Sequence, residues 1–464
     1  MGPAGNSPSP RYSASYFLLT EYTFSYMKKI TNTLWFKQDP KSNLSFRMVA
    51  VFGRYILKLF SVGLAAWLGS AGILLYHFYT INPLTSIWTV IVFPFVAGIL
   101  ILGYLKIILS FLLPSSAALL GVIVNLLSDF LIWLVKLFAQ VDISQILIEH
   151  ISLTPIVFYY VFILFAGFVH FRRPLIKKVI CTVTVLLMIA FLGVTKWQRT
   201  HQDNLIMTCL DVGHGQAILA QLPGGANALF DAGSLSRDDV GRRIVCPFLD
   251  YIGISKIDAI IISHNDVDHI NGIPEIAEFC KVGGVYANKA FFGKTDQWGT
   301  ARFLEESLSK KGLEIQLLGE ELNLQGSARI KIIWPNEKIC ADSTLSDNDK
   351  SVVCLIEFAG RRILLCSDIE KFAQKELLRM MPNLEADVVV VPHHSLAKTL
   401  EGDFIGSLGA DILICSCGRR DYEKQQLTEA KNNAKLFYTA EDGAITVRID
   451  NDGTIKSRTQ PRSR

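Results

Sequence analysis

Four side chains that commonly bind metal ions fall within six residues of this 464-residue chain: His264, Asp266, Asp268 and His269. The apolar run Ala259–Ile262 comes just before them and predicts a buried strand, and Asn271-Gly272 predicts a turn after them. The spacing therefore predicts a loop that folds two imidazoles and two carboxylates around one or two divalent ions. Water on such an ion loses a proton near neutral pH and becomes a nucleophile. An acidic turn without metal is the alternative, although burying these groups without an ion is costly.

Further acidic and imidazole side chains follow other apolar runs: Asp211, Asp231, Asp368, His393 and His394. Side chains at separate strand ends can converge on one site. Asp368 is placed to bridge two ions, or instead to cap the helix expected after it. His393-His394 follows Pro392 and could form an ordinary polar turn, but beside the loop at 264–269 we favour metal ligation.

The elements that must position these side chains differ between the two halves of the chain. Half of all residues are hydrophobic and the mean hydropathy is +0.33, which is too apolar for an ordinary soluble enzyme of this length. Residues 1–202 hold 16 Lys and Arg against 5 Asp and Glu, net +11, whereas residues 203–464 hold 30 against 37, net −7. A basic, apolar front and an acidic rear predict two domains. The nine cysteines include no Cys-x-x-Cys pair, which argues against a zinc ribbon.

Five apolar stretches of the front half predict transmembrane helices: Leu59–Tyr79, Leu84–Leu105, Ser115–Ala139, Pro155–Phe171 and Val179–Trp197. The third contains Asn125, Asp129 and Lys136, and if it lies flat on the membrane the number of spans falls to four. Basic residues cluster before the first stretch and between the fourth and fifth, and the positive-inside rule places both clusters in the cytoplasm. Five spans in the cell membrane would then put the rear domain outside the cytoplasm.

Short apolar runs alternate with helix-like segments in the rear half, which predicts two sheets between outer helices, an αββα sandwich. Strands are expected at, among others, Leu205–Leu210, Ala259–Ile262, Val388–Val391 and Ala444–Ile449, and helices at Gly241–Tyr251, Phe303–Lys311 and Lys371–Met380. We therefore divide the chain into a polar tail (1–46), a transmembrane helical domain (47–200), a metal-binding α/β domain (203–450) and a basic C-terminal tail (451–464).

Several rear segments agree in order and spacing with the metallo-β-lactamase domain of ComEC-type DNA-internalisation competence proteins, which the rear half resembles: Leu210–Ala217, Leu229–Gly233, Ile262–Gly272, Asn348–Val353, Leu365–Asp368 and Val391–Ser395. The preceding apolar region, notably Ser61–Leu105, is similar to the later part of that family's membrane channel domain. The resemblance covers about residues 55–450. It implies a partial channel domain followed by a metallo-β-lactamase-like α/β domain.

The resemblance also implies ligands and a reaction. One ion would be held by His264, Asp266 and Asp368, and the other by Asp268, His269, His393 and Asp368. The metal would be zinc or manganese, because carboxylate ligands favour Mn²⁺ whereas the general affinity order favours Zn²⁺. In the family this domain is thought to degrade one DNA strand while the channel passes the other. Candidate catalytic residues are Asp268, Asp211 and Lys398; Lys398, like Arg419 and Arg420, would steady phosphate charge or is simply a surface cation.

The chain departs from the family pattern at several motifs. The family's Asp-Val-Gly-Gln-Gly-Asp run is Asp211–Gln216 here, with Gln216 in place of the second carboxylate. The His-His-Gly-Ser run lacks its glycine after His394, and no histidine occurs in 418–425. The family's N-terminal domain and first channel half have no counterpart, so we expect a fragment, or a chain that completes a pore with other DNA-uptake components or a second copy.

Three functions follow from these observations. The first is a membrane-embedded, metal-dependent nuclease for DNA uptake, with single-stranded DNA as substrate. The second is a membrane-anchored hydrolase of a smaller ester, and the third is a channel component whose metal site is inactive. The net negative charge of the rear domain argues against tight DNA binding, because phosphate contacts normally come from a basic face. Bound metal ions and a patch of Arg237, Arg242 and Arg243 would offset part of that charge.

Overall fold

The computed structural model describes residues 44–460 apart from 142–143, 170–172, 296–298 and 425–433. The chain divides into two compact units, with the division between Leu192 and Gly193, and each is described by itself. The predicted polar tail at 1–46 lies almost wholly outside the described residues.

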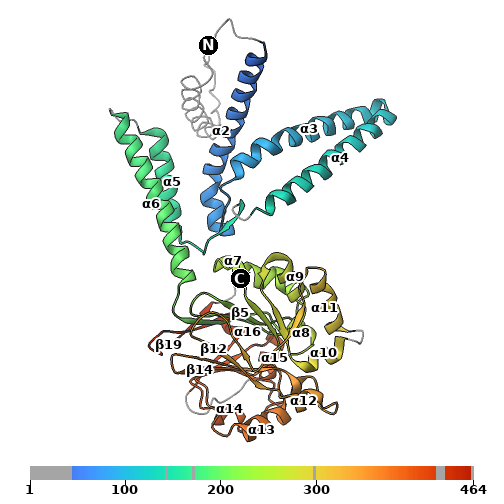
Figure 1. Cartoon of the computed structure of the whole chain (residues 1–464), viewed down its shortest axis with the longest axis vertical. Helices are drawn as coiled ribbons and strands as arrows, with labels where there is room; N and C mark the ends of the chain where they lie inside the picture. The colour runs from blue at the N-terminus through green and yellow to red at the C-terminus, as the bar shows by residue number, and fades with distance from the viewer. Residues whose placement is uncertain (1–43, 142–143, 170–172, 296–298, 425–433, 461–464) are drawn as a thin grey trace, which may run out of the picture. The chain divides into compact units, whose positions relative to one another are not determined.

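Five helices and one pair of very short strands build the described part of the first unit. The helices are α2 (Leu44–Phe78), α3 (Thr85–Leu112), α4 (Pro114–Ala139), α5 (Leu153–Phe168) and α6 (Pro174–Thr200), the last of which continues into the second unit. Strand β1 (Thr80–Ile81) pairs antiparallel with β2 (Ile146–Leu147). Helices α3 and α4 lie side by side as a hairpin (Figure 1). Pro114 separates them, because proline is favoured in a first helical turn and cannot continue a preceding helix.

Four of these helices, α2, α3, α4 and α6, are long and apolar enough to cross a membrane. Among the five predicted spans, the one least suited to cross a membrane is the fourth and not the third, which the sequence analysis had singled out for its polar residues. The third stretch, with its three polar residues, forms the 26-residue α4, whereas the fourth forms the 16-residue α5. A helix of 16 residues is about 24 Å long, which is shorter than a bilayer core of about 30 Å.

Two tyrosines of α5 fasten it to α2. The hydroxyl of Tyr159 donates to the carbonyl of Leu68 at 2.7 Å. The hydroxyl of Tyr160 donates to the carbonyl of Gly69 at 3.0 Å and accepts from the amide of Ile73 at 3.1 Å. Gly72 permits this approach, because a Cβ there would lie 2.7 Å from the Tyr160 ring.

Two large sheets face each other in the second unit. The eight-stranded sheet has the order β10-β9-β7-β5-β4-β3-β18-β19, and the seven-stranded sheet has the order β11-β12-β13-β14-β15-β16-β17. The first comprises β10 (Ile315–Leu317), β9 (Val285–Ala287), β7 (Ala259–Ile262), β5 (Asn227–Ala232), β4 (Ala217–Gln221), β3 (Leu205–Cys209), β18 (Ala444–Ile449) and β19 (Ile455–Gln460). The second comprises β11 (Glu321–Leu322), β12 (Arg329–Trp334), β13 (Val353–Phe358), β14 (Arg361–Leu365), β15 (Val388–Val390), β16 (Ile412–Cys415) and β17 (Lys435–Tyr438). A small parallel pair joins β6 (Lys256–Ile257) to β8 (Lys281–Val282).

Helices cover the outer face of each sheet (Figure 1). Those with the first sheet are the π-helical η2 (Gly241–Val245), α7 (Cys246–Tyr251), α8 (Val267–Ile270), α9 (Ile273–Phe279), α10 (Lys289–Thr295) and α11 (Thr300–Ser309). The helical segments that alternate with the strands of the second sheet are α12 (Glu337–Ala341), η3 (Asn348–Lys350), α13 (Lys371–Met380), η4 (His393–Ser395), α14 (Phe404–Ser407), α15 (Arg419–Lys424) and α16 (Thr439–Asp442). Of these, η4 lies at the edge where the two sheets meet. One apolar core lies between the sheets and one under each helical layer, which confirms the predicted αββα sandwich.

The connections after the strands place polar side chains at one edge of the sandwich. Strands β5 and β7 run parallel, as do β14, β15 and β16, so their carboxyl ends share an edge of each sheet. Residues 231, 264, 368, 394 and 416 lie at or just after these ends. Residues 451–464 were predicted to form a basic tail, but residues 455–460 form strand β19, which pairs with β18 at the edge of the sheet.

Candidate metal centre

Three buried ligand atoms converge at the edge where the two sheets meet. They are Nε2 of His264, Nε2 of His269 and one carboxylate oxygen of Asp368, all within 4.8 Å of one another. Nε2 of His269 lies 3.3 Å from Oδ1 of Asp368. All three atoms are buried without a hydrogen-bond partner. Such orphan atoms are costly, and a divalent ion among them would satisfy all three, so the residues present fit a metal.

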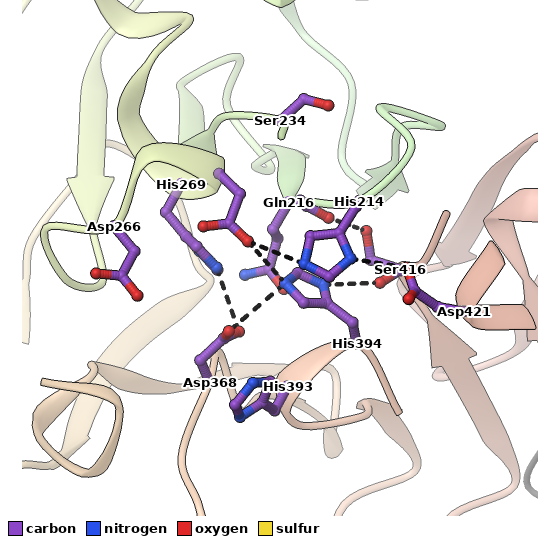
Figure 2. A network of polar contacts seen from close by, with 12 residues as sticks. His214, Gln216, Ser234, Asp266, His269, Asp368, His393, His394, Ser416 and Asp421 are labelled. Atoms are coloured by element: carbon purple, nitrogen blue, oxygen red, sulfur yellow. Dashed lines mark hydrogen bonds and ion pairs between the residues drawn. The ribbon is translucent and has the colours of Figure 1, made fainter. Parts of the chain in front are cut away.

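A second group of facing atoms lies beside the first (Figure 2). Nε2 of His394 and Nε2 of His214 lie 3.3 Å and 3.5 Å from Oδ2 of Asp268. Nε2 of His394 also lies 3.5 Å from Oδ2 of Asp368. The two oxygens of Asp368 therefore face different groups, Oδ1 the first and Oδ2 the second, which is the arrangement of a bridging carboxylate.

The opposite nitrogen of each ring is occupied by a protein acceptor. The Nδ1–H group of His269 donates to Asp231 at 2.8 Å, and that of His394 donates to the Ser416 carbonyl at 2.9 Å. Nδ1 of His264 lies 2.9 Å from the Ser263 hydroxyl. In neutral imidazoles bound this way, the Nε2 lone pair is free for a metal, and the ring orientation is fixed.

Asp231 is the buried anchor of this arrangement. Its carboxylate accepts from the amide of Ser263 at 2.8 Å, from Nδ1 of His269 at 2.8 Å and from the side-chain amide of Gln216 at 3.2 Å. Gln216 stands where the family motif has its second carboxylate, so here that position contributes a donor to Asp231.

Left-handed backbone conformations concentrate around the same atoms. Five non-glycine residues near the site have positive φ, from 47° to 62°: Asp231, Ser367, His393, His394 and Ser395. Each costs of order 1–3 kcal/mol, and such strain persists only where the surrounding structure holds it. Ser395 takes a conformation suited to glycine at the position where the His-His-Gly-Ser motif has glycine.

Charges within the site shift several pKa values. Burial alone lowers the pKa of the His269 imidazole, but the carboxylates of Asp368 and Asp231 outweigh it, and the net shift is strongly upward. Burial alone raises the pKa of Asp368, but His394 and His269 bring it well below its usual range. The pKa of Asp268 falls to about 2, because the hydrogen bond from His394 and nearby imidazoles outweigh burial. Both carboxylates are therefore ionised at neutral pH, as metal ligands must be.

Four of the six predicted ligands lie in the two groups of ligand atoms, and the other two, Asp266 and His393, lie outside them. His264, His269 and Asp368 meet in the first group, and Asp268 lies in the second. Asp266 lies at the rim with its side chain 49% exposed, and its Oδ2 is 3.5 Å from Nε2 of His264. His393 points to Glu370, with 3.3 Å between Nδ1 and Oε1, and His394 takes the inward position.

The remaining predicted catalytic residues lie outside both groups of ligand atoms. Asp211 is half-buried and begins the connection from β3 that carries His214. Lys398 is exposed and lines a cavity of about 400 Å³ together with Asp349, Glu370 and Lys371. Each arginine of the predicted patch faces a carboxylate: Arg237 and Arg243 share Asp239, and Arg242 lies beside Glu275, with 3.4 Å between Nη2 and Oε1. Three arginines against two carboxylates leave the patch only weakly basic.

Sequence reasoning gave no site role to two residues that the geometry singles out, His214 and Asp421. It favoured His394 for metal ligation together with His393, and it named Asp231 only as one of several polar side chains at strand ends. The signal for His214 was a histidine between two glycines in the loop that follows a strand. The signal for Asp231 was a carboxylate at the end of a buried strand. Asp421 carried no signal, since its importance depends on a contact with a residue 207 positions away.

Comparison with known proteins bears on both units. The family model described as "Competence protein" matches residues 23–173, and the metallo-β-lactamase superfamily model matches residues 210–416. The chain is 25% identical to ComE operon protein 3 of Bacillus subtilis (strain 168) over 419 residues, which cover 84% of this chain and 51% of that one. It is 22% identical to competence protein ComA of Neisseria gonorrhoeae over 304 residues, covering 61% and 40%. The chain thus spans about half the length, or less, of these relatives.

Among solved structures, the metallo-β-lactamase fold protein YhfI from Bacillus subtilis aligns with a TM-score of 0.34 and 13% identity, covering 55% of this chain and 100% of that one. The two family models lie in the same order as the two structural units, apolar helices first and αββα sandwich second. In domain content and order, the chain therefore resembles ComEC-type competence proteins, with a competence domain followed by a metallo-β-lactamase domain.

Proposed function

We propose that this chain is a membrane-embedded DNA-uptake protein whose metallo-β-lactamase domain hydrolyses DNA phosphodiester bonds with divalent metal ions, zinc or manganese. The observation that carries the proposal is the group of imidazole Nε2 atoms around the carboxylates of Asp268 and Asp368. The rings of His269 and His394 are oriented through Nδ1, which donates to a protein acceptor. Two relatives whose names contain "ComE operon" and "Competence" supply the DNA-uptake context.

The ligand sets differ from those that the family resemblance implies. His264, His269 and Asp368 would hold the first ion, and Asp268, His394 and the second oxygen of Asp368 would face the other position. Bound ions would supply charge for the phosphate and acidity for a nucleophilic water. Asp266, at the exposed rim beside His264, would join the first set or orient its water.

The chain's own residues then have separate tasks. Asp231 and the Ser416 carbonyl keep the imidazoles of His269 and His394 in the tautomer that presents Nε2. Asp368 stays ionised and links the two positions. Lys398, exposed at the rim of its cavity, is available as a cation for a substrate phosphate, and Asp211 is retained as a candidate polar contact on the loop after β3.

The membrane topology is part of the proposal. If all five helices of the first unit cross the membrane and the basic segments lie in the cytoplasm, the second unit is extracytoplasmic. The 16-residue α5 decides this parity. A cysteine at the exposed position 402, in a variant without the native cysteines, should react with an impermeant maleimide in intact spheroplasts. Labelling only after lysis would place the unit in the cytoplasm.

The nuclease proposal is tested on the full-length protein in detergent. End-labelled single-stranded DNA is incubated with protein loaded with Zn²⁺ or Mn²⁺, alongside Asp368→Asn and the control Asp258→Asn, which changes a carboxylate at the opposite end of β7. We expect cleavage by the wild type and the control but not by Asp368→Asn. Hydrolysis of bis-p-nitrophenyl phosphate without DNA cleavage would favour a small-ester hydrolase. Metal binding with neither activity would favour an inactive channel component.

A further inference from the structure

His214 lies at the mouth of the site. The exposed fraction of the side chain rises from 1% for His394 to 11% for Asp268 and 29% for His214. Its Nε2 faces Asp268 Oδ2 at 3.5 Å, and its ring centre lies 4.7 Å from that of His394. The second group of ligand atoms therefore has two deep members and one member next to solvent.

The ring of His214 is oriented in the same way as the inner imidazoles. Its Nδ1–H group donates to Oδ2 of Asp421 at 2.7 Å, which leaves the Nε2 lone pair facing Asp268. Asp421 belongs to α15, the short helix that follows β16, and its side chain is 19% exposed. A histidine whose far nitrogen is fixed by a carboxylate is the usual arrangement behind a metal-bound imidazole.

The loop that carries His214 is held on several sides. The amide of His214 donates to the Ser236 hydroxyl at 3.0 Å, and its carbonyl accepts from the amide of Leu235 at 2.7 Å. One residue on, the carbonyl of Gly215 accepts from the Ser416 hydroxyl at 2.8 Å. These contacts fix the backbone, so the imidazole does not depend on a mobile loop for its position.

We propose that His214 is a metal ligand which, positioned by Asp421, completes the second metal position with Asp268 and His394. The loop between β3 and β4 thereby contributes an imidazole, His214, whereas segment 418–425 contains no histidine. That segment instead contributes Asp421, the carboxylate that positions His214. Because this ligand is half-buried while the first group is fully buried, the second ion binds more weakly and is the first to be lost. The inference rests on the proposed metal-dependent function but not on DNA being the substrate.

The experiment measures metal binding and not cleavage. Full-length protein in detergent is freed of metal and titrated with Zn²⁺ against a chromophoric chelator, and Co²⁺ absorption spectra of the same samples report the coordination of each ion. We expect two ions in the wild type. His214→Ala should keep the first with unchanged affinity and lose the second by at least about 10-fold. Asp421→Asn should keep both, with the second weakened by about 10–100-fold and its Co²⁺ spectrum altered.

Matched controls separate these roles from general damage. His201→Ala removes an imidazole at the end of α6, and Glu423→Gln neutralises a carboxylate of α15 that pairs with Arg419. Both should bind two ions as the wild type does. A wild type with one ion, a His214→Ala variant that keeps two, or an Asp421→Asn variant with wild-type affinity and spectrum would overturn the inference. Two ions bound as expected but no DNA cleavage would contradict only the nuclease proposal.

Discussion

Replacing Asp231 by asparagine tests how the site prepares its histidines. The carboxylate accepts three hydrogen bonds, and an amide of the same shape can accept on only one side. If the new NH₂ group faces His269, the ring must accept at Nδ1 and carry its proton on Nε2, which removes the lone pair from the metal. If the NH₂ group faces Ser263, the buried amide of Ser263 loses its acceptor. Asparagine tolerates the positive φ of this position, so the backbone can remain.

Either orientation carries a definite penalty. Loss of a partner behind a metal-bound histidine weakens metal affinity about 10–100-fold, and a buried amide without an acceptor costs about 1–3 kcal/mol. We therefore expect the first Zn²⁺ to bind at least about 10-fold more weakly to Asp231→Asn than to the wild type, or the apo protein to lose about 1–3 kcal/mol of stability.

The assay combines a chelator competition titration with Zn²⁺ and thermal denaturation of the metal-free protein. The control is Asp258→Asn, since Asp258 accepts from a backbone amide at 2.9 Å at the other end of β7. An Asp231→Asn variant with both wild-type affinity and wild-type stability would refute the role assigned to Asp231.

Three further predictions concern the same edge of the sandwich. Ser395→Gly should stabilise the protein by about 1 kcal/mol in denaturant unfolding, because glycine adopts a φ of 62° without strain. Gly215→Ala should abolish binding of the second ion or prevent folding, because a Cβ there would lie 2.3 Å from the Gly233 carbonyl, and titration or circular dichroism will detect either outcome. Zn²⁺ affinity should rise with pH above 6.5, by up to about tenfold per pH unit. The raised pKa keeps His269 protonated in the metal-free protein, and the ion must displace that proton to bind. A Zn²⁺ affinity that does not change between pH 6.5 and 8.5 would contradict this prediction.

The elements predicted best are those whose apolar residues recur with the period of a strand or a helix. Strands β7 and β18 and helix α13 have the bounds predicted for them. Strand β19 was instead interpreted as a basic tail, because Lys456 and Arg458 alternate with less polar residues at a half-exposed sheet edge. Charged side chains are common on edge strands, where they oppose aggregation, so composition alone points away from a strand there.

Residue types at the site were predictable, but their grouping was not. The spacing of the loop at 264–269 does not reveal that a turn of helix, α8, directs Asp268 and His269 to different groups. Similarly, a His-His pair does not disclose which ring turns inward, because the left-handed conformations at 393 and 394 decide it. Local sequence thus predicts a metal loop, whereas the choice of partners depends on backbone geometry that only the folded sandwich fixes.

The origin of the ligands has a consequence for folding. In the first group, His264 and His269 follow β7 of the eight-stranded sheet, whereas Asp368 follows β14 of the seven-stranded sheet. An ion among them would therefore join the two sheets directly, and metal at 100 times its dissociation constant would add about 2.7 kcal/mol to stability. Without an ion, the buried orphan atoms and nearby left-handed residues oppose folding. The strain at this edge and the affinity for metal are thus two aspects of one arrangement, because the left-handed conformation of His394 costs stability and also belongs to the turn that brings its imidazole to Asp268 and Asp368.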